Sequence, residues 1–355
     1  MNSCIAFDIG GANIKAASTR RMACQRPFQL WQAPQQLPEQ LADVLSKYPK
    51  PDRIGVTMTG ELADCFESKQ SGVRRIVEAS RQVFGPSTRF YQTSGRFVKS
   101  NRAIAEWSQT AASNWHALAA WVAQQTENGF LIDIGSTTAD LIPFQHGQPC
   151  PRGNTDLGRL KHHELVYTGV GRSPVSCVVG SVNLDTTNEI PLAQEVFATM
   201  QDVYLLAGRI DPDPENCSTA DGRPLTVSGS RRRMARLLCA DPPELSAGEI
   251  EAITQSASAA QRQLIISKLE KLVADHPTIP LHFVVSGQGE WLARTAIQQG
   301  FPTVGQIRSI QDLVGNHDPI PHDACSGGEH GSPENLAQCA PAYAVACLLE
   351  KQNGR

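Results

Sequence analysis

One pattern occurs twice in this chain and constrains its fold more than any other feature. A short apolar strand reaches Asp8, and a Gly-rich turn then leads into a second extended segment, 14–17. The same succession recurs 125 positions later around Asp133, where the turn carries hydroxyl residues. A repeat of strand, Asp-x-Gly and strand predicts two similar halves, each with one β-hairpin.

Both turns have the residue types that phosphate binding requires. Glycine lets the backbone approach a ligand closely and present its N–H groups to anionic oxygens. Two such hairpins on opposite sides of a cleft would bind a phosphate chain, while Asp8 and Asp133 would hold a hydrated Mg²⁺. A third Gly-rich turn follows the predicted strand 281–285. The predicted phosphate- or nucleotide-binding residues are Gly10, Gly11, Asn13, Lys15, Gly135, Ser136, Thr137, Thr138, Gly287, Gly289 and Glu290.

The length of 355 residues also favours two lobes, because single hydrophobic cores stop growing near about 250–300 residues. We expect an N-terminal lobe, 1–128, and a C-terminal lobe, 129–355. The irregular segment 150–225 is rich in Gly, Pro and Thr, and we expect it to reach over the cleft as a substrate loop.

Predicted strands and helices alternate along the chain, which indicates an α/β fold. Further strands are predicted at 54–58, 89–92 and 139–144, and helices at 39–47, 73–84, 115–125, 192–206, 231–238, 247–274 and 333–349. The predicted helix 192–206 would place Glu195, Thr199 and Asp202 on one face, which we expect to be exposed to solvent.

The net charge and the composition limit which ligands and binding partners are expected. The net charge of −3 provides no positive field for nucleic acid or an anionic membrane, so we expect a small phosphorylated molecule as ligand. No apolar run approaches the length of a membrane span, and a cytoplasmic location is predicted. The ten cysteines include no CxxC pair, which argues against zinc-ribbon and thioredoxin-type sites and favours reduced thiols. The His-containing segment 316–331 is expected to be an exposed loop, and metal binding there stays open.

Several longer motifs resemble a known family. The order of the three Gly-rich turns is similar to that of the phosphate-1, phosphate-2 and adenosine motifs in the actin, sugar kinase and Hsp70 superfamily of ATPases. More narrowly, the chain resembles the hydantoinase/oxoprolinase-related branch of that superfamily, which includes methanofuran-pathway and tetrahydromethanopterin-linked one-carbon proteins. The segments that carry this resemblance are 9–17, 56–66, 164–170, 197–204 and 219–224. It implies duplicated ribonuclease-H-like lobes around a central cleft.

The resemblance also implies a transfer reaction. A furanmethyl diphosphate would lose pyrophosphate as its methylene is joined to the phenolic oxygen of a glutamyl-tyramine, with Mg²⁺ stabilising the leaving group and a carboxylate accepting the phenol proton. The candidate catalytic residues are Asp8, Asp133 and Glu61. The candidate substrate-binding residues are Thr57 and Thr59, which follow a predicted strand, and Arg152, Glu164, Tyr167 and Arg172, which lie in the irregular segment.

Two other functions stay open from the sequence. The phosphate motifs also allow ATP as ligand, and an ATP-dependent kinase or amidohydrolase is the second function. A nucleotide-binding regulatory protein that closes its lobes without turnover is the third class. Asn13 stands where the superfamily often has a hydroxyl residue, and no unambiguous general base marks a sugar kinase. Both a monomer and a homodimer are compatible with the sequence.

Overall fold

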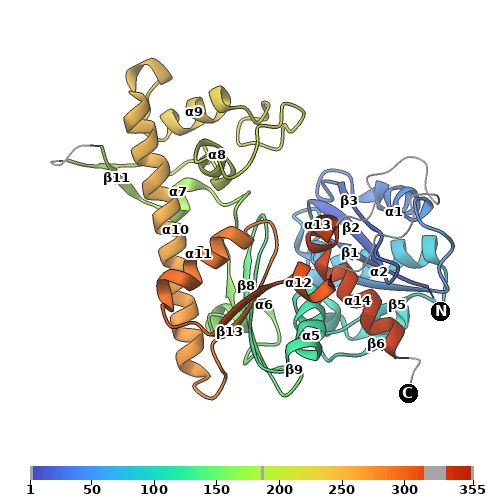
Figure 1. The fold of residues 1–355 in the computed structure, drawn as a ribbon. Helices are drawn as coiled ribbons and strands as arrows, with labels where there is room; N and C mark the ends of the chain where they lie inside the picture. The colour runs from blue at the N-terminus through green and yellow to red at the C-terminus, as the bar shows by residue number, and fades with distance from the viewer. Residues whose placement is uncertain (1–2, 185–187, 316–332, 353–355) are drawn as a thin grey trace.

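Two mixed β-sheets, one in each lobe, organise the computed structural model, which describes residues 3–184, 188–315 and 333–352 (Figure 1). The first sheet has the order β3-β2-β1-β4-β5-β6 and the second β10-β8-β7-β13-β14, with β9 paired to β8. The first sheet comprises β1 (Cys4–Ile9), β2 (Asn13–Ser18), β3 (Ala23–Pro27), β4 (Arg53–Met58), β5 (Arg89–Tyr91) and β6 (Phe97–Val98). The second comprises β7 (Gly129–Ile134), β8 (Ala139–Gln145), β9 (Gln148–Pro149), β10 (Leu165–Val166), β13 (His282–Ser286) and β14 (Gln306–Ser309).

The strand pairings of the two sheets match. In each sheet the central strand pairs antiparallel with the next strand of its hairpin and parallel with a strand from much later in its lobe. Asp8 lies opposite Lys15 and Thr57, and Asp133 lies opposite Asp140 and Ser286. The predicted duplicated ribonuclease-H-like architecture is therefore confirmed.

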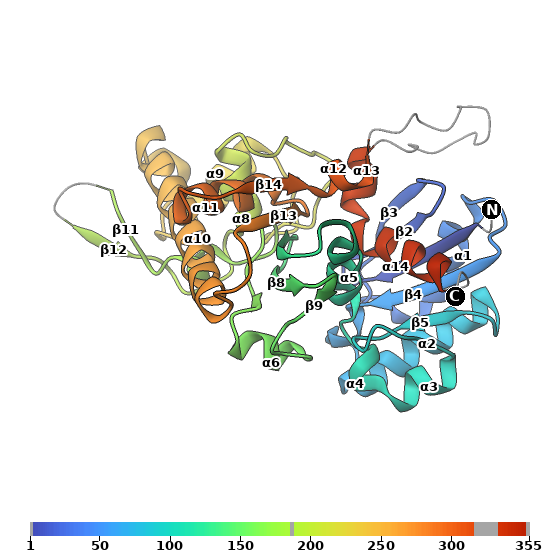
Figure 2. The ribbon, with the colours of Figure 1, turned by 60° about the horizontal axis from the view of Figure 1, so that its bottom comes forward.

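Helices cover both faces of the first sheet (Figure 2). On one face, β1 side chains such as Phe7 share a core with Leu41 of α1 and Ile76 of α2. On the other, Cys4 and Ala6 pack against Val345 and Leu349 of α14. The helices of this lobe are α1 (Leu37–Ser46), α2 (Lys69–Phe84), α3 (Ser100–Ala105), α4 (Trp107–Thr110), α5 (Asn114–Thr126) and α14 (Ala340–Lys351), with 3-10 turns η1 (Pro34–Gln36) and η2 (Gly60–Leu62).

The C-terminal helix α14 thus completes the lobe that β1 begins (Figure 1). Gly55 permits this packing, because a Cβ at that position would lie 2.9 Å from Val345 Cγ1. The predicted division of the lobes at residue 128 stays a prediction. It does not take account of α14, which comes after residue 128 in the sequence but packs on β1 of the first lobe. Helix α5 joins the lobes, since Leu118 packs in one cluster with Leu131 of β7 and Ala344 of α14.

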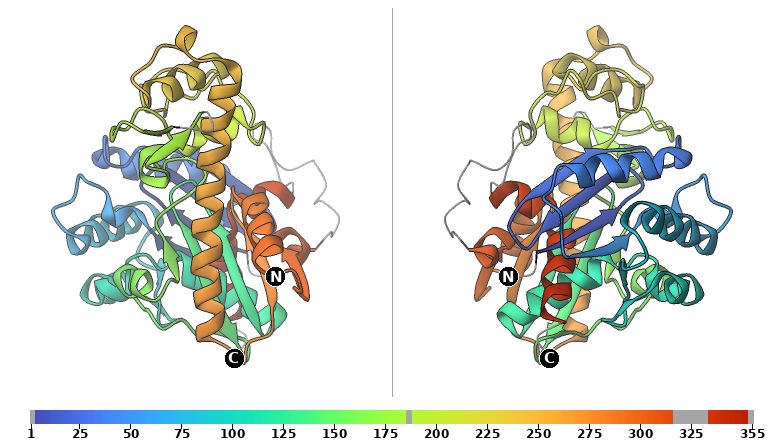
Figure 3. Two further views of the ribbon diagram at one scale, coloured as in Figure 1. Left: turned by 90° about the vertical axis from the view of Figure 1, so that its left-hand side faces the viewer. Right: turned by 90° about the vertical axis from the view of Figure 1, so that its right-hand side faces the viewer.

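The second lobe is built around α10 (Ala247–Asp275), a 29-residue helix that runs along one side of its sheet (Figure 3). Its Ile253, Ile265 and Leu269 share the core with Phe130 and Phe283. The other elements of this lobe are α6 (Asp156–Lys161), α7 (Val175–Val178), α8 (Met200–Leu206), α9 (Val227–Arg236), η3 (Pro242–Glu244), α11 (Glu290–Gly300), α12 (Ile310–Val314) and the ribbon β11 (Ser181–Asn183) with β12 (Glu189–Pro191). Helix α13 (Pro333–Gln338) contacts α12 and also β3 of the first lobe. Among the described residues no helix is long and apolar enough to cross a membrane.

The predicted helix 192–206 is wrong over its first half, since only Met200–Leu206 is helical. Thr199 and Asp202 form a capping box that starts α8 at this point. Glu195 lies before the helix, so the predicted exposed polar face does not exist. The predicted helix 333–349 is also interrupted: Cys339 separates α13 from α14, and Pro341 lies in the first turn of the second helix.

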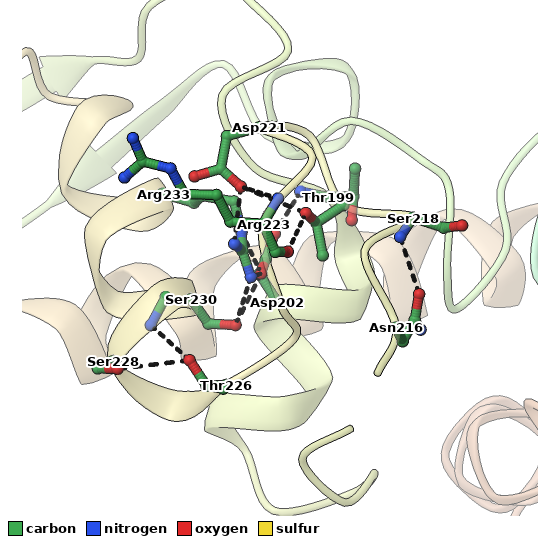
Figure 4. A network of polar contacts seen from close by, with 12 residues as sticks. Thr199, Asp202, Asn216, Ser218, Asp221, Arg223, Thr226, Ser228, Ser230 and Arg233 are labelled. Atoms are coloured by element: carbon green, nitrogen blue, oxygen red, sulfur yellow. Dashed lines mark hydrogen bonds and ion pairs between the residues drawn. The ribbon is translucent and has the colours of Figure 1, made fainter. Parts of the chain in front are cut away.

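Asp202 instead belongs to a buried polar network (Figure 4). Its carboxylate pairs with Arg233 at 2.7 Å and accepts a hydrogen bond from Ser230 at 2.7 Å. Arg233 also pairs with Asp221 at 2.9 Å. Because Arg233 is fully buried, these two carboxylates neutralise a charge that has no access to water. The network therefore ties the loop around Asp221 to α8 and α9.

Candidate active site

A cavity of about 470 Å³ lies between the lobes, at the loops that follow β1, β4, β7 and β13. Residues from both hairpin turns line it, as the duplicated fold predicts. The predicted residues in its wall are Asp8, Gly10, Gly11, Asn13, Lys15, Thr59, Glu61, Asp133, Gly135, Ser136, Thr137, Thr138, Tyr167, Arg172 and Gly287. The structure thus brings most of the predicted site residues to one place.

The two hairpin turns have the same internal geometry. The Gly10 N–H donates to the Asn13 carbonyl at 2.9 Å, and the Gly135 N–H donates to the Thr138 carbonyl at 2.9 Å. Both donors and both acceptors are again 125 positions apart. Each turn is closed by a hydrogen bond within its own backbone, and the binding of an anion by its other N–H groups stays a prediction.

The third Gly-rich turn packs directly against the second hairpin. Gly287 has a φ of 87°, and a Cβ there would lie 2.3 Å from the Ile134 carbonyl oxygen and 2.6 Å from Asp133 Oδ1. The Gly289 N–H donates to the same carbonyl at 2.9 Å. Glycine is therefore required at 287 both by backbone conformation and by close approach.

Four carboxyl groups in the cavity wall have raised pKa values, those of Asp140 and of the three predicted catalytic residues. Burial raises the pKa of Asp8, although Lys15 and the Asn114 side chain stabilise its charged form. Burial and the neighbouring Asp140 raise the pKa of Asp133 to about 6. Burial raises the pKa of Glu61 to about 7. Carboxyl groups that titrate near neutral pH are suited to proton transfer.

Glu61 is held rigidly at its position. It is 1% exposed and lies in η2, where its Oε2 atom has no hydrogen-bond partner. Gly72 of α2 packs so closely that a Cβ there would lie 2.4 Å from the Glu61 carbonyl oxygen. A buried carboxylate oxygen without a protein partner, in a cavity wall, is available to a ligand.

The cavity also contains cationic groups. The positive charge of Lys15 partly opposes the rise in the pKa of Asp8 that burial causes. Arg159 pairs with Asp140, and its guanidinium carbon stacks 4.1 Å from the centroid of the Trp115 ring. Lys69 of α2 forms an ion pair with Asp156 of α6. Since those two helices belong to different lobes, this ion pair joins them beside the cavity.

Five predicted residues lie outside the cavity wall, and their contacts are structural. Thr57 is buried, with its Oγ1 atom 2.9 Å from Ser113 Oγ. The Glu164 carboxylate accepts hydrogen bonds from the backbone N–H groups of Arg152 and Gly153, while the Arg152 side chain pairs with Asp275 at 2.9 Å. Glu290 pairs with Arg294 at 2.8 Å, and Gly289 packs on Ile134. None of the five lines the cavity, and the ligand-binding roles expected of them stay predictions.

Other residues in the wall were not predicted, and they come from distant parts of the chain. They are Trp31, Asp64, Asn114, Trp115, Asp140, Asp156, Arg159 and Gln288, among others. Asp140 is the one for which a signal exists, because it lies opposite Asp133 in the second hairpin. Trp31 and Trp115 follow no local motif, and only the packing of the lobes brings them to the cavity.

The carboxylates fit a hydrated magnesium ion. Such an ion retains several waters and needs only one or two protein carboxylates plus substrate phosphates. Asp8 and Asp133 meet that requirement, since they lie at matching strand positions and Asp8 Oδ1 is buried without a partner. Within the described residues no group of three or more His, Cys, Asp or Glu side chains gathers as a closed metal site. The predicted segment 316–331 lies outside the described residues.

Two ribonuclease-H-like lobes with facing phosphate-type hairpins define a protein of the actin, sugar kinase and Hsp70 fold class. The solved structure of nucleotide-free acetone carboxylase shares this fold with a TM-score of 0.52 and 10% identity, over 97% of this chain and 70% of that chain. Residues 52–304 match the hydantoinase/oxoprolinase family, and the chain belongs to that family.

Two archaeal relatives share one name, (4-{4-[2-(γ-L-glutamylamino)ethyl]phenoxymethyl}furan-2-yl)methanamine synthase. The protein of Methanocaldococcus jannaschii is 28% identical over 355 residues, which cover 98% of both chains. The protein of Methanococcus vannielii is 31% identical over 174 residues, 49% of this chain and 76% of the relative.

Proposed function

We propose that this protein is a transferase of one-carbon cofactor biosynthesis that joins a furanmethyl diphosphate to the phenol of a glutamyl-tyramine and releases pyrophosphate. The observation that carries the proposal is the composition of one cavity, in which facing phosphate-type turns occur together with the aromatic side chains of Trp31, Trp115 and Tyr167. Turns of the type that binds anions favour a diphosphate as donor, and the aromatic side chains in the cavity wall favour the flat furan and phenol rings. The name shared by the two archaeal relatives supports the same reaction.

In the proposed reaction the donor binds through its diphosphate. The turns at 10–13 and 135–138 supply backbone N–H groups, and Ser136, Thr137 and Thr138 add hydroxyl donors. Asp8 and Asp133 would hold the magnesium ion, which supplies charge neutralisation for the leaving pyrophosphate when it is bound. Lys15 adds a positive charge on the same side.

Glu61 is the proposed general base. The phenol O–H transfers its proton to a Glu61 carboxylate oxygen, and the phenolic oxygen forms a bond to the furan methylene. The bond between that methylene and the diphosphate oxygen breaks, and the electron pair leaves with pyrophosphate. A base with a pKa of about 7 is half ionised at neutral pH and still basic enough to accept a proton in the transition state.

The proposal includes the expected small phosphorylated substrate and a cytoplasmic location. The nine cysteines within the described residues are all free, which supports a reducing compartment. ATP stays the alternative ligand, because the fold class binds nucleotides through the same turns.

The test is direct. Purified protein is incubated with Mg²⁺, the furanmethyl diphosphate and γ-glutamyl-tyramine, and both pyrophosphate and the mass of the ether product are measured. We expect both products in equal amounts. No pyrophosphate release with these substrates, together with tight ATP binding and substrate-stimulated ADP release, would replace the proposal with the kinase alternative.

A further inference from the structure

One aromatic residue and one cation meet across the cavity. The guanidinium carbon of Arg172, in the second lobe, lies 4.9 Å from the centroid of the Trp31 ring, in the first lobe. Both residues line the cavity. We propose that Arg172 and Trp31 form a clasp across the cleft and that Arg172 binds the outer phosphate of the diphosphate. This inference rests on the proposed function only because that function identifies the donor as a furanmethyl diphosphate.

Trp31 is connected to the first phosphate-type turn. The Leu30 N–H donates to the Gly11 carbonyl at 2.9 Å, and the Phe28 N–H donates to the Ala12 carbonyl at 3.0 Å. The segment that carries Trp31 is therefore attached by its backbone to the turn that would contact the ligand. A movement of this turn toward a bound anion would move Trp31 with it.

Arg172 is connected to the second turn in the same way. The N–H groups of Gly171 and Arg172 both donate to the Ser136 carbonyl, at 3.0 and 2.7 Å. Gly169 packs so closely on this turn that a Cβ would lie 2.5 Å from the Gly135 carbonyl oxygen. The clasp thus joins the two phosphate-type turns through one side chain from each lobe.

The buried residue Gln261 of α10 fixes the segment that precedes Arg172. Its amide donates to the Gly169 carbonyl at 2.9 Å and to Thr168 Oγ1 at 2.7 Å. A stack on Trp31 uses the face of the guanidinium group and leaves its in-plane N–H donors directed outward. No acidic side chain within the described residues forms an ion pair with Arg172, so these donors are available to ligand oxygens.

A phosphate is favoured over the carboxylate of the acceptor as the partner of Arg172. The backbone hydrogen bonds that hold the segments of Trp31 and Arg172 run to the two phosphate-type turns, to Gly11, Ala12 and Ser136. Two oxygens of one phosphate match the fork of a guanidinium group, and such charge-assisted pairs are about twice as strong as neutral hydrogen bonds.

The experiment measures binding of inorganic pyrophosphate with Mg²⁺ by calorimetry, which needs no turnover. Arg172→Ala is expected to raise the Kd about tenfold or more, Arg172→Lys to restore only part of the affinity, and Trp31→Ala to weaken binding less than Arg172→Ala. Arg209→Ala is the matched control, because Arg209 stacks 5.5 Å from the Trp291 centroid outside the cavity wall, and its Kd should equal that of the wild type. Arg172 is exposed, so its variants should fold, and thermal melting checks this.

An unchanged pyrophosphate Kd in Arg172→Ala would overturn the clasp. So would a rise only in the KM for γ-glutamyl-tyramine with no change for the donor, which would assign Arg172 to the acceptor carboxylate. If the wild type binds pyrophosphate and Arg172→Ala binds it weakly, the clasp is supported even where no ether forms. The failure of the proposed reaction and the failure of the clasp are thereby distinguished.

Discussion

Lys15 and Asp140 occupy the same position in the two hairpins and carry opposite charges. Lys15 lies opposite Asp8 in the first hairpin, and Asp140 lies opposite Asp133 in the second. In the second hairpin the positive charge comes instead from Arg159, which pairs with Asp140. The duplicated hairpins are therefore not electrostatically equivalent, which is suited to a ligand with two different ends.

This difference predicts opposite effects of two substitutions. Asp140→Asn leaves Arg159, which is 1% exposed, without the ion-pair partner in closest contact, and we expect a loss of about 3–5 kcal/mol in the free energy of unfolding. Lys15→Met removes a cavity-wall cation that interacts with Asp8 but forms no ion pair within 4.0 Å among the described residues, so it should leave the melting temperature close to that of the wild type and weaken pyrophosphate binding. Thermal denaturation and calorimetry measure both quantities. The reverse pattern would contradict these roles.

Asp8 and Asp133 should be indispensable for the reaction. Asp8→Asn and Asp133→Asn each remove a proposed magnesium ligand, and we expect pyrophosphate release to fall at least about 100-fold. Both variants should fold, because burial already favours the neutral form of each carboxyl group. Glu290→Gln is the control, since Glu290 pairs with Arg294 outside the cavity and should retain full activity. A rate near wild type in either Asp variant would exclude that residue from catalysis.

We expect the ionisation of Glu61 to determine how the reaction rate falls at acid pH. Its pKa is raised to about 7, so at lower pH it is protonated and cannot accept the phenol proton. The value of kcat/KM, which reports the pKa of the free enzyme, should therefore rise with pH up to about 7 and then level off. Glu61→Gln should lower kcat by about 100-fold to 10,000-fold and abolish this rise. A variant that keeps the rise would show that another group is the base.

We expect position 287 to tolerate no side chain, not even that of alanine. Gly287→Ala combines a φ of 87° with a Cβ that would lie 2.3 Å from a backbone oxygen, and we expect a loss of more than about 1 kcal/mol in the free energy of unfolding. Gly248→Ala is the matched control near the start of α10, because its Cβ would lie 4.0 Å from Ser246 Oγ, an ordinary contact, and the substitution should be neutral or stabilising. Chemical denaturation compares the two. Equal stabilities would contradict the close packing of the third turn.

Local sequence determined the hairpins. Because Asp8 and Asp133 each end an apolar segment that Gly-rich residues follow, both the strand pairs and the facing turns could be predicted. The short elements α3, α4 and α6 were not predicted, since short helices depend on tertiary packing more than on their own periodicity. The predicted helix through Glu195 failed for a related reason: the apolar residues near it pack into the core from an irregular backbone.

The amino-acid sequence by itself therefore determined the duplication and the residues of its phosphate-type turns, because these depend on short segments whose backbone closes on itself. Only the tertiary structure decided which side chains complete the cavity. The side chains of Glu164 and Thr57 form hydrogen bonds with buried groups and do not line the cavity. Trp31, Trp115 and Arg159 line it instead. The physical reason is that side chains distant along the chain meet only when α5 and α14 pack the lobes together, and no local pattern records that contact.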